Sequence, residues 1–111
     1  MSYDMVLKAK VERERHNKYV HVADGGGITW NVHELIEKSS GWTIKNEANN
    51  GLAEDIGKLI ERGIYELETS PEEYEQYESP NGWGTIDGTL NFYRYLLEAC
   101  KEYPYAYVFV Y

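Results

Sequence analysis

The chain of 111 residues contains few of the side chains that common site chemistries require. Its single cysteine, Cys100, excludes an internal disulfide and fits a reducing cytosol. The three histidines have no metal-binding spacing and there is no Cys-x-x-Cys pair, so we expect neither a metal site nor a cofactor. Apolar runs are too short to span a membrane, and charges interrupt the region where a secretory signal would lie. We therefore expect a soluble protein of the cytoplasm.

Basic residues are also scarce, and they are unevenly placed. The chain has 11 Lys and Arg against 19 Asp and Glu, a net charge of −8. Residues 1–45 carry seven basic and six acidic side chains, whereas residues 46–111 carry four basic and thirteen acidic ones. Direct binding of nucleic acid is disfavoured, because phosphate contacts require Lys and Arg. A protein partner with a basic surface is favoured instead, although solubility alone also accounts for such a charge.

Alternating apolar and polar side chains predict a strand near each end of the sequence. Residues 3–11 place an apolar side chain at every second position, which is the period of a half-buried strand. In residues 105–111 we expect the small apolar side chains of Ala106, Val108 and Val110 to face the core. The opposite face consists of Tyr105, Tyr107, Phe109 and Tyr111. An exposed row of this kind would suit a protein partner or self-association.

The segment after the first strand predicts a hairpin followed by a loop. Residues 12–18 predict a turn and residues 19–22 a second short strand. Residues 24–27, Asp-Gly-Gly-Gly, predict a loop, because three successive glycines cost too much conformational entropy inside a strand or helix. This loop lacks the lysine and the hydroxyl residue of a P-loop, so a flexible turn is favoured over a phosphate cradle. Residues 42–50 predict irregular structure.

Apolar side chains at helical spacing predict two long helices. The first covers residues 52–67, where Gly57 and Gly63 indicate close contact with a neighbouring element. The second begins after the N-cap residue Thr85, carries Cys100 on its buried face and ends before Pro104. A buried thiol is usually an inert core residue, so we assign no catalytic role to this cysteine.

Capping residues predict two shorter helices. Asn31 and Glu34 form a capping-box pattern for a helix over residues 32–38 that ends at Gly41. Ser70 and Pro71 start a helix over residues 71–77. The sequence therefore predicts a single α+β domain over residues 1–111. Its small antiparallel sheet includes the N- and C-terminal strands and packs against two long helices and one or two short helices.

The densest feature is a run of acidic side chains between the two long helices. Residues 61–78 contain seven glutamates and one basic residue, Arg62, so their mutual repulsion is not neutralised locally. A solvated surface accounts for the run without any partner, whereas the functional hypothesis is a surface that binds a basic groove. That hypothesis assigns partner binding to Glu66, Glu68, Glu72, Glu73, Glu75, Tyr77 and Glu78.

A glycine-flanked tryptophan follows this run. Trp83 lies between Gly82 and Gly84 in a Pro-Asn-Gly-Trp-Gly turn. It is predicted to fill space under the second long helix rather than to form an exposed anchor, because large apolar rings are seldom left in solvent.

The order of these motifs resembles a group of small, mostly uncharacterised proteins of bacteriophages and mobile elements. The motifs are Thr-Trp-Asn-Val at residues 29–32, Ser-Pro-Glu-Glu at 70–73, Pro-Asn-Gly-Trp-Gly at 80–84 and Leu-Leu-Glu-Ala-Cys at 96–100. The resemblance covers residues 28–111, and its most specific part is the turn followed by the Leu-Leu-Glu-Ala-Cys helix. It implies a phage-type accessory protein in a bacterial host cytoplasm, and it implies no catalytic residue.

These observations lead to three hypotheses, and an enzyme is the least supported class. The first is a non-enzymatic protein that inhibits a host nucleic-acid-handling or defence system, of the anti-CRISPR or anti-restriction kind, through an acidic, tyrosine-rich surface. The second is a module that sequesters a small molecule or nucleotide at the loop over residues 25–27. The third is a phage structural or assembly protein, for which a homo-oligomer would be the sign.

Overall fold

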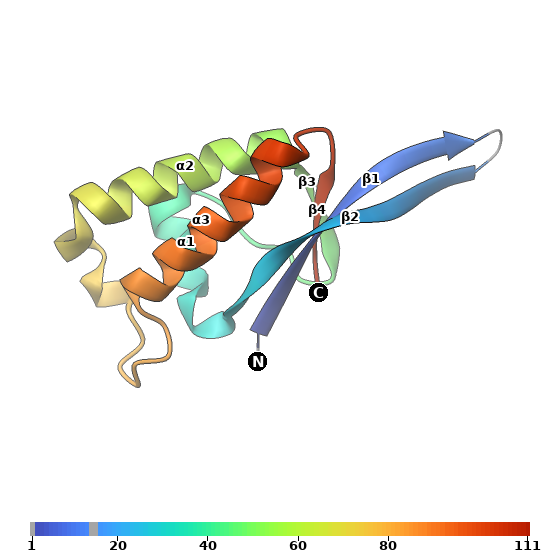
Figure 1. Cartoon of the computed structure of the whole chain (residues 1–111). Coiled ribbons are helices and arrows are strands. Elements are labelled where there is room, and N and C mark those ends of the chain that lie inside the picture. The colour runs from blue at the N-terminus through green and yellow to red at the C-terminus, as the bar shows by residue number, and fades with distance from the viewer. Residues whose placement is uncertain (1, 14–15) are drawn as a thin grey trace.

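A four-stranded antiparallel sheet and three α-helices make up the part of the chain that the computed structural model describes, residues 2–13 and 16–111. The elements in chain order are β1 (Ser2–Arg13), β2 (His16–Thr29), α1 (His33–Ser40), β3 (Ala48–Leu52), α2 (Ala53–Thr69), α3 (Ile86–Glu102) and β4 (Tyr107–Val110) (Figure 1). Three short 3-10 helices complete the description: η1 (Trp30–Val32), η2 (Pro71–Glu73) and η3 (Glu75–Tyr77).

The strands near the two ends of the sequence form the centre of the sheet, whose order is β2-β1-β4-β3. β1 pairs with β4 in antiparallel register, with Met5 opposite Val110 and Leu7 opposite Val108. These four side chains are buried, because alternate positions of both strands point to the same face. The predicted pairing of the two terminal strands is therefore confirmed.

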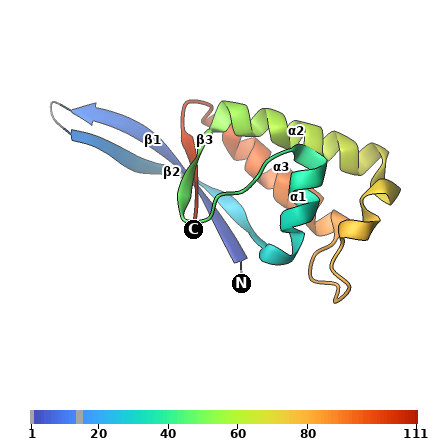
Figure 2. The same ribbon diagram turned by 180° about the vertical axis from the view of Figure 1, so that it is seen from behind.

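All three α-helices cover one face of this sheet, as Figures 1 and 2 show from opposite sides. The apolar stripes of α2 and α3 pack together and close the core, with Ile60, Tyr93 and Leu96 fully buried. The α+β class, the two long helices and the small sheet that includes both terminal strands are confirmed. Of the predicted caps for these helices, Thr85 is correct: its Oγ1 accepts a hydrogen bond from the Gly88 amide at 3.0 Å.

The predicted loop over residues 24–27 is wrong, because these residues continue β2. Gly25 faces the core, where an added β-carbon would lie 2.8 Å from Leu96 Cδ1 and 2.9 Å from Met5 Cβ. Gly26 has a φ of +82° and lies under the Tyr95 ring. The pairing of β1 with β2 shifts register twice here, which is the mark of β-bulges. The glycines therefore allow α3 to approach the sheet closely, and their entropic cost is offset by packing.

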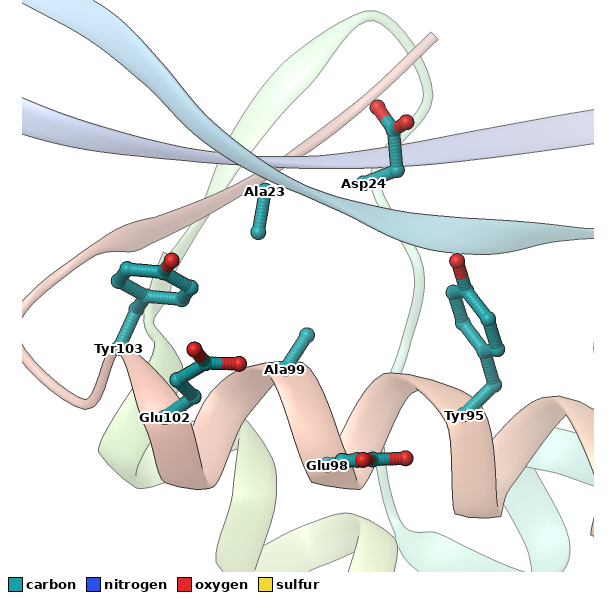
Figure 3. Close-up of a pocket in the computed structure, with 7 residues that line it drawn as sticks. All are labelled: Ala23, Asp24, Tyr95, Glu98, Ala99, Glu102 and Tyr103. Carbon is teal, nitrogen blue, oxygen red and sulfur yellow. The ribbon is translucent and has the colours of Figure 1, made fainter.

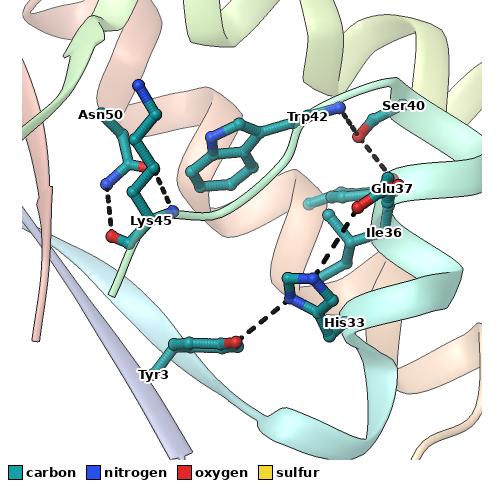
Figure 4. Close-up of polar contacts among 9 residues, drawn as sticks. Tyr3, His33, Ile36, Glu37, Ser40, Trp42, Lys45 and Asn50 are labelled. Carbon is teal, nitrogen blue, oxygen red and sulfur yellow. Dashed lines mark hydrogen bonds and ion pairs between the residues drawn. The ribbon is translucent and has the colours of Figure 1, made fainter. Parts of the chain in front are cut away.

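Three smaller predictions also need correction. Residues 42–50 are not wholly irregular, because β3 begins at residue 48 and pairs with β4. The Asn50 side chain makes two hydrogen bonds to the backbone of Lys45, much as a neighbouring strand would. It accepts one from the Lys45 amide at 2.8 Å and donates one to the Lys45 carbonyl at 2.9 Å (Figure 4). Asn31 does not cap α1, whose N-cap is Val32, although Gly41 ends that helix with a φ of +82° as predicted. Residues 71–77 form η2 and η3 rather than one helix.

β1 and β2 continue beyond the sheet as a two-stranded ribbon, which we call the arm (residues 9–13 and 16–20). The pairing of β1 with β4 stops at Lys8, opposite Tyr107. The pairing of β1 with β2 continues to Arg13, opposite His16. Figure 1 shows the arm projecting away from the helices. The turn predicted over residues 12–18 is too long, because residues 12–13 belong to β1 and residues 16–18 to β2; residues 14–15 lie outside the described residues.

Candidate protein-binding surface

The connection between α2 and α3, residues 70–85, carries most of the acidic positions singled out from the sequence. η2 and η3 fold its first half, and a hydrogen-bonded turn folds its second half. In that turn the Ser79 amide donates to the Gly84 carbonyl at 3.1 Å. Figure 1 shows the connection, coloured yellow to orange, at the opposite end of the molecule from the arm.

The predicted partner-binding residues divide into two groups, and the first group is free. Glu72, Glu73 and Glu75 are exposed. Within residues 2–13 and 16–111, no ion pair or hydrogen bond engages their carboxylates. All three lie on η2 and η3, whose backbone hydrogen bonds fix the directions of the side chains. Their negative charge is therefore available to a partner.

The remaining acids of the prediction have partners within the chain, and two of them, Glu66 and Glu78, hold the connection in place. Glu66 accepts a hydrogen bond from the Tyr74 hydroxyl at 3.2 Å, which joins α2 to the connection. Burial, and then the neighbouring Glu66 carboxylate, raise the pKa of Tyr74, so this phenol keeps the proton that it donates. Glu68 lies 3.7 Å from Arg94 of α3.

Glu78 and Tyr77 complete this supporting group. The Oε2 atom of Glu78 accepts a hydrogen bond from the Ile86 amide at 2.8 Å, so a carboxylate satisfies a free donor at the N-terminus of α3. Tyr77 is half-buried and packs against the core beside Tyr74, with ring centroids 6.4 Å apart. Glu66, Tyr77 and Glu78 therefore support the segment that carries the exposed carboxylates and do not add to the exposed acidic surface.

The predicted burial of Trp83 is wrong, because 73% of this residue is exposed. The residue that packs inward at this turn is Gly84, where a β-carbon would lie only 2.8 Å from Val32 Cγ1. The Asn81 side chain accepts from the Trp83 amide at 3.0 Å and fixes the turn with the indole outside. Trp83 is therefore an exposed aromatic side chain, which is the alternative that the sequence left open.

The aromatic row of β4 forms a second exposed surface on the face of the sheet that the helices leave uncovered. Tyr111 is 47% exposed and Tyr105 is 60% exposed, whereas Ala106 and its inward neighbours are buried as predicted. Tyr19 of β2 meets this row edge-on, with its ring centroid 5.0 Å from that of Phe109.

Lys8 covers part of the same row from β1. Its ammonium nitrogen lies 4.8 Å from the Phe109 ring centroid and 4.9 Å from that of Tyr111, and it donates a hydrogen bond to the Tyr111 hydroxyl. The rings of this surface therefore already have partners within the chain.

Cys100 and two of the histidines, His21 and His33, have surroundings that give them a structural role. Cys100 is only 2% exposed, and burial raises the pKa of its thiol to about 12, so it remains protonated and unreactive near neutral pH. His21 lies 3.0 Å from Asp24, and His33 lies 3.7 Å from Glu37 and 3.1 Å from the Tyr3 hydroxyl (Figure 4). Among the described residues, no group of three His, Cys, Asp or Glu is placed to hold a metal ion.

Three of the described cavities border α3. The two beside β2 do not favour a phosphate, whereas the third, between α2 and α3, includes Lys58 and Lys101 in its lining. The first, of about 330 Å³, lies between β2 and α3 and is lined by Ala23, Asp24, Tyr95, Glu98, Ala99, Glu102 and Tyr103 (Figure 3). The second, of about 390 Å³, is lined by Gly26, Gly27, Gly88, Asn91, Phe92 and Tyr95. The lining residues described for these two cavities include no Lys or Arg, which a nucleotide phosphate would need. The geometry of these two cavities thus gives little support to nucleotide sequestration at residues 25–27.

Comparison with known proteins adds no family assignment to this α+β domain. No model of a known protein family, no curated protein and no solved structure matches the chain. Within the described part of the chain, none of the helices has the length and apolar character that crossing a bilayer requires.

Proposed function

We propose that this chain is a non-enzymatic binding protein that engages a basic surface of a protein partner through the connection between α2 and α3. The observation that supports this proposal is the composition of that connection. It presents three exposed carboxylates that have no ion-pair or hydrogen-bond partner among the described residues, those of Glu72, Glu73 and Glu75, together with the exposed indole of Trp83.

The two kinds of side chain would have different roles in binding. The carboxylates attract a basic surface over several ångströms and speed the encounter, an effect that salt weakens. Trp83 supplies a large apolar area, and tryptophan is among the residues that most often dominate the free energy of a protein interface. The contacts of Glu66 and Glu78 fix the connection before binding, which lowers the entropy lost on association.

The nature of the partner is a narrower part of the proposal. A surface that binds nucleic acid is basic, so a protein that handles nucleic acid is a natural target for three clustered carboxylates. The resemblance to phage and mobile-element proteins adds a bacterial host, and within it a defence system of the CRISPR or restriction kind. Inhibition would follow from occupying the basic groove.

Charge reversal tests the proposal against a matched control. The test variant is Glu72→Lys, Glu73→Lys and Glu75→Lys, and the control is Glu54→Lys, Asp55→Lys and Glu61→Lys on exposed positions of α2. Both variants change the net charge equally. Affinity capture from a bacterial lysate at low and high salt identifies the partner, and surface plasmon resonance with the purified partner then measures each variant.

The test variant should lose binding through a lower association rate, whereas the control should bind like the unmodified chain. Trp83→Ala should raise the dissociation rate about 30-fold, as expected for a hot spot of about 2 kcal/mol. Equal loss in both triple variants would show that only the total charge matters and would refute the proposed surface.

A further inference from the structure

The arm exposes apolar side chains on both of its strands, and no third strand among the described residues supports it. Val11 is 39% exposed and Val20 is 43% exposed. Ala9 pairs with Val20 and Val11 pairs with Lys18, so these four side chains share one face of the ribbon. Met5 and Leu7, which lie earlier in β1, are on this same face, and there the helices cover it.

An isolated two-stranded ribbon is at best marginally stable in water, because it buries too little apolar surface. The outer face of the arm is partly supported, since Tyr19 packs against Tyr107 and Phe109. The inner face, with Val11 and Val20, extends past the end of the helical layer and remains uncovered. A surface that covers the inner face would therefore stabilise the arm.

The charges of the chain indicate what that surface is. The arm carries three basic side chains and one acidic side chain, whereas the rest of the chain carries eight basic and eighteen acidic ones. The arm is thus a basic ribbon on a strongly acidic body, and each copy of the chain complements another copy. The acidic body disfavours a polyanion as the occupant, because the whole molecule would repel it.

The cavity between β2 and α3, which is lined by acidic groups, lies beside the base of the arm. Ala23, at one wall of this cavity, pairs with Leu7, two positions before the arm begins. Glu98 and Glu102 lie one turn apart on α3 at the same cavity, with Tyr95 and Tyr103 beside them (Figure 3). Both glutamates are exposed, and no ion pair among the described residues engages either carboxylate.

We propose that two copies of the chain form a two-fold symmetric dimer in which the arms pack antiparallel through their inner faces. Val11 and Val20 of one copy cover those of the other near the symmetry axis. The five residues from Ala9 to Arg13 span about 16 Å, so the Arg13 end of each arm reaches the base of the other. Lys18, exposed on the inner face, then meets Glu98 and Glu102 of the second copy.

Such an interface is isologous and closes on itself, so it produces a dimer and not a filament. It lies at the opposite end of the molecule from the connection that we propose binds a basic partner. A dimer would therefore present two such connections at its far ends, and the two proposals stand or fall separately.

Sedimentation velocity on the full chain over a range of concentrations tests the dimer. We expect a monomer–dimer equilibrium that shifts toward monomer as salt increases. Val11→Thr with Val20→Thr keeps two β-branched side chains in the arm but removes apolar area, and it should raise the dimer Kd about tenfold or more. Circular dichroism confirms that the variant keeps its fold.

A charge exchange identifies the contact between copies. Lys18→Glu alone should weaken the dimer, and so should Glu98→Lys with Glu102→Lys, whereas the combination of all three should restore it. Net charge alone predicts a different result, because replacing two glutamates by lysines brings the net charge of −8 closer to zero and would strengthen association. Lys38→Glu, an exposed position on α1, serves as the matched control and should leave the dimer intact.

Three results would overturn the proposal. One is a monomer at every salt and concentration up to the solubility limit, and another is a dimer that the valine variant leaves unchanged. The third comes from titration of fluorescein-labelled single-stranded and duplex oligonucleotides. If they bind the unmodified chain and Lys18→Glu abolishes that binding while no dimer is detected, the arm serves a nucleic acid instead of a second copy.

Discussion

Tyr93 occupies the space that the missing side chain of Gly63 leaves on α2. A β-carbon at Gly63 would lie 2.6 Å from Cε2 of the Tyr93 ring and 3.1 Å from Cβ of Ser40. The Tyr93 hydroxyl continues to α1, where it donates to the Ile36 carbonyl at 3.2 Å and shares a 2.7 Å hydrogen bond with Ser39 Oγ. One ring of α3 therefore contacts both other helices.

The first prediction concerns this contact. Gly63→Ala gains roughly 1 kcal/mol of helix propensity but forces a β-carbon into the ring, so it should lower the free energy of unfolding by a net 1–2 kcal/mol, roughly. Gly57→Ala on the same helix is the control, because its β-carbon would lie 3.4 Å from Cys100 Cβ and 3.7 Å from Leu97 Cδ1. It should be neutral or stabilising by up to about 1 kcal/mol. Urea unfolding measures both, and equal effects would contradict the close contact.

The second prediction separates the two groups of acids in the connection. Glu78→Ala removes the acceptor of the Ile86 amide and should cost about 0.5–2 kcal/mol, the range of a lost helix cap. Glu75→Ala, on an exposed carboxylate, should change stability by less than about 0.5 kcal/mol. Urea unfolding of the two variants side by side decides this, and a larger loss for Glu75→Ala would reverse the assignment.

The third prediction follows from the exposure of Trp83. Trp83→Ala should alter the free energy of unfolding by less than about 0.5 kcal/mol, because few intramolecular contacts are lost. Trp42→Ala, at a position only 3% exposed, should cost about 3–5 kcal/mol. Acrylamide should quench the fluorescence of Trp83 far more than that of Trp42. A large destabilisation by Trp83→Ala would indicate a buried indole.

The fourth prediction concerns alkaline pH. Burial raises the pKa of Cys100 from 9.0 to about 12, so the folded state keeps a proton that the unfolded state releases above its own pKa. The contribution to stability is complete below about pH 9 and is lost as the pH rises toward 12. Unfolding by urea over this range should show a falling free energy of unfolding.

Cys100→Ala is the control for this titration and should make the decline shallower. Part of the decline should remain, because burial also raises the pKa of Tyr93 and of Tyr3. An unchanged slope in Cys100→Ala would show that the thiol does not titrate differently in the two states. Native Cys100 should also resist iodoacetamide until the chain unfolds.

The fold was predictable where one periodic pattern extends over many residues. The stripe that includes Ile56 and Ile60 defines α2, and the alternation of Val108 and Val110 correctly separates the two faces of β4. Prediction failed where a local preference yields to a distant contact. The entropy argument against Gly25 in a strand was outweighed by packing against Leu96, which lies 71 residues later in the sequence and occupies space that only glycine leaves open.

The candidate site was predictable in composition but not in geometry. The sequence indicates that Glu66 and Glu72 belong to one acidic run, but it does not show that the first is bonded to Tyr74 while the second is free. The exposure of Trp83 depends on Gly84 packing against Val32, a contact between distant segments. The sequence does contain a signal for the arm. The alternation over residues 3–11 is longer than the part of β4 that pairs with β1, so β1 must extend beyond the end of β4.

The pairing of Met5 with Val110 also has a consequence for how the chain folds. Closing a loop of this length adds little to the equilibrium cost, since the entropy grows only with the logarithm of loop length. Contacts so distant in sequence nevertheless slow folding, whereas α2 and α3 meet across a short connection. The helical layer should therefore assemble early, and the joining of β1 to β4 should set the folding rate. Until that step the β1–β2 hairpin keeps an unpaired edge, which makes the slow phase the one most exposed to aggregation.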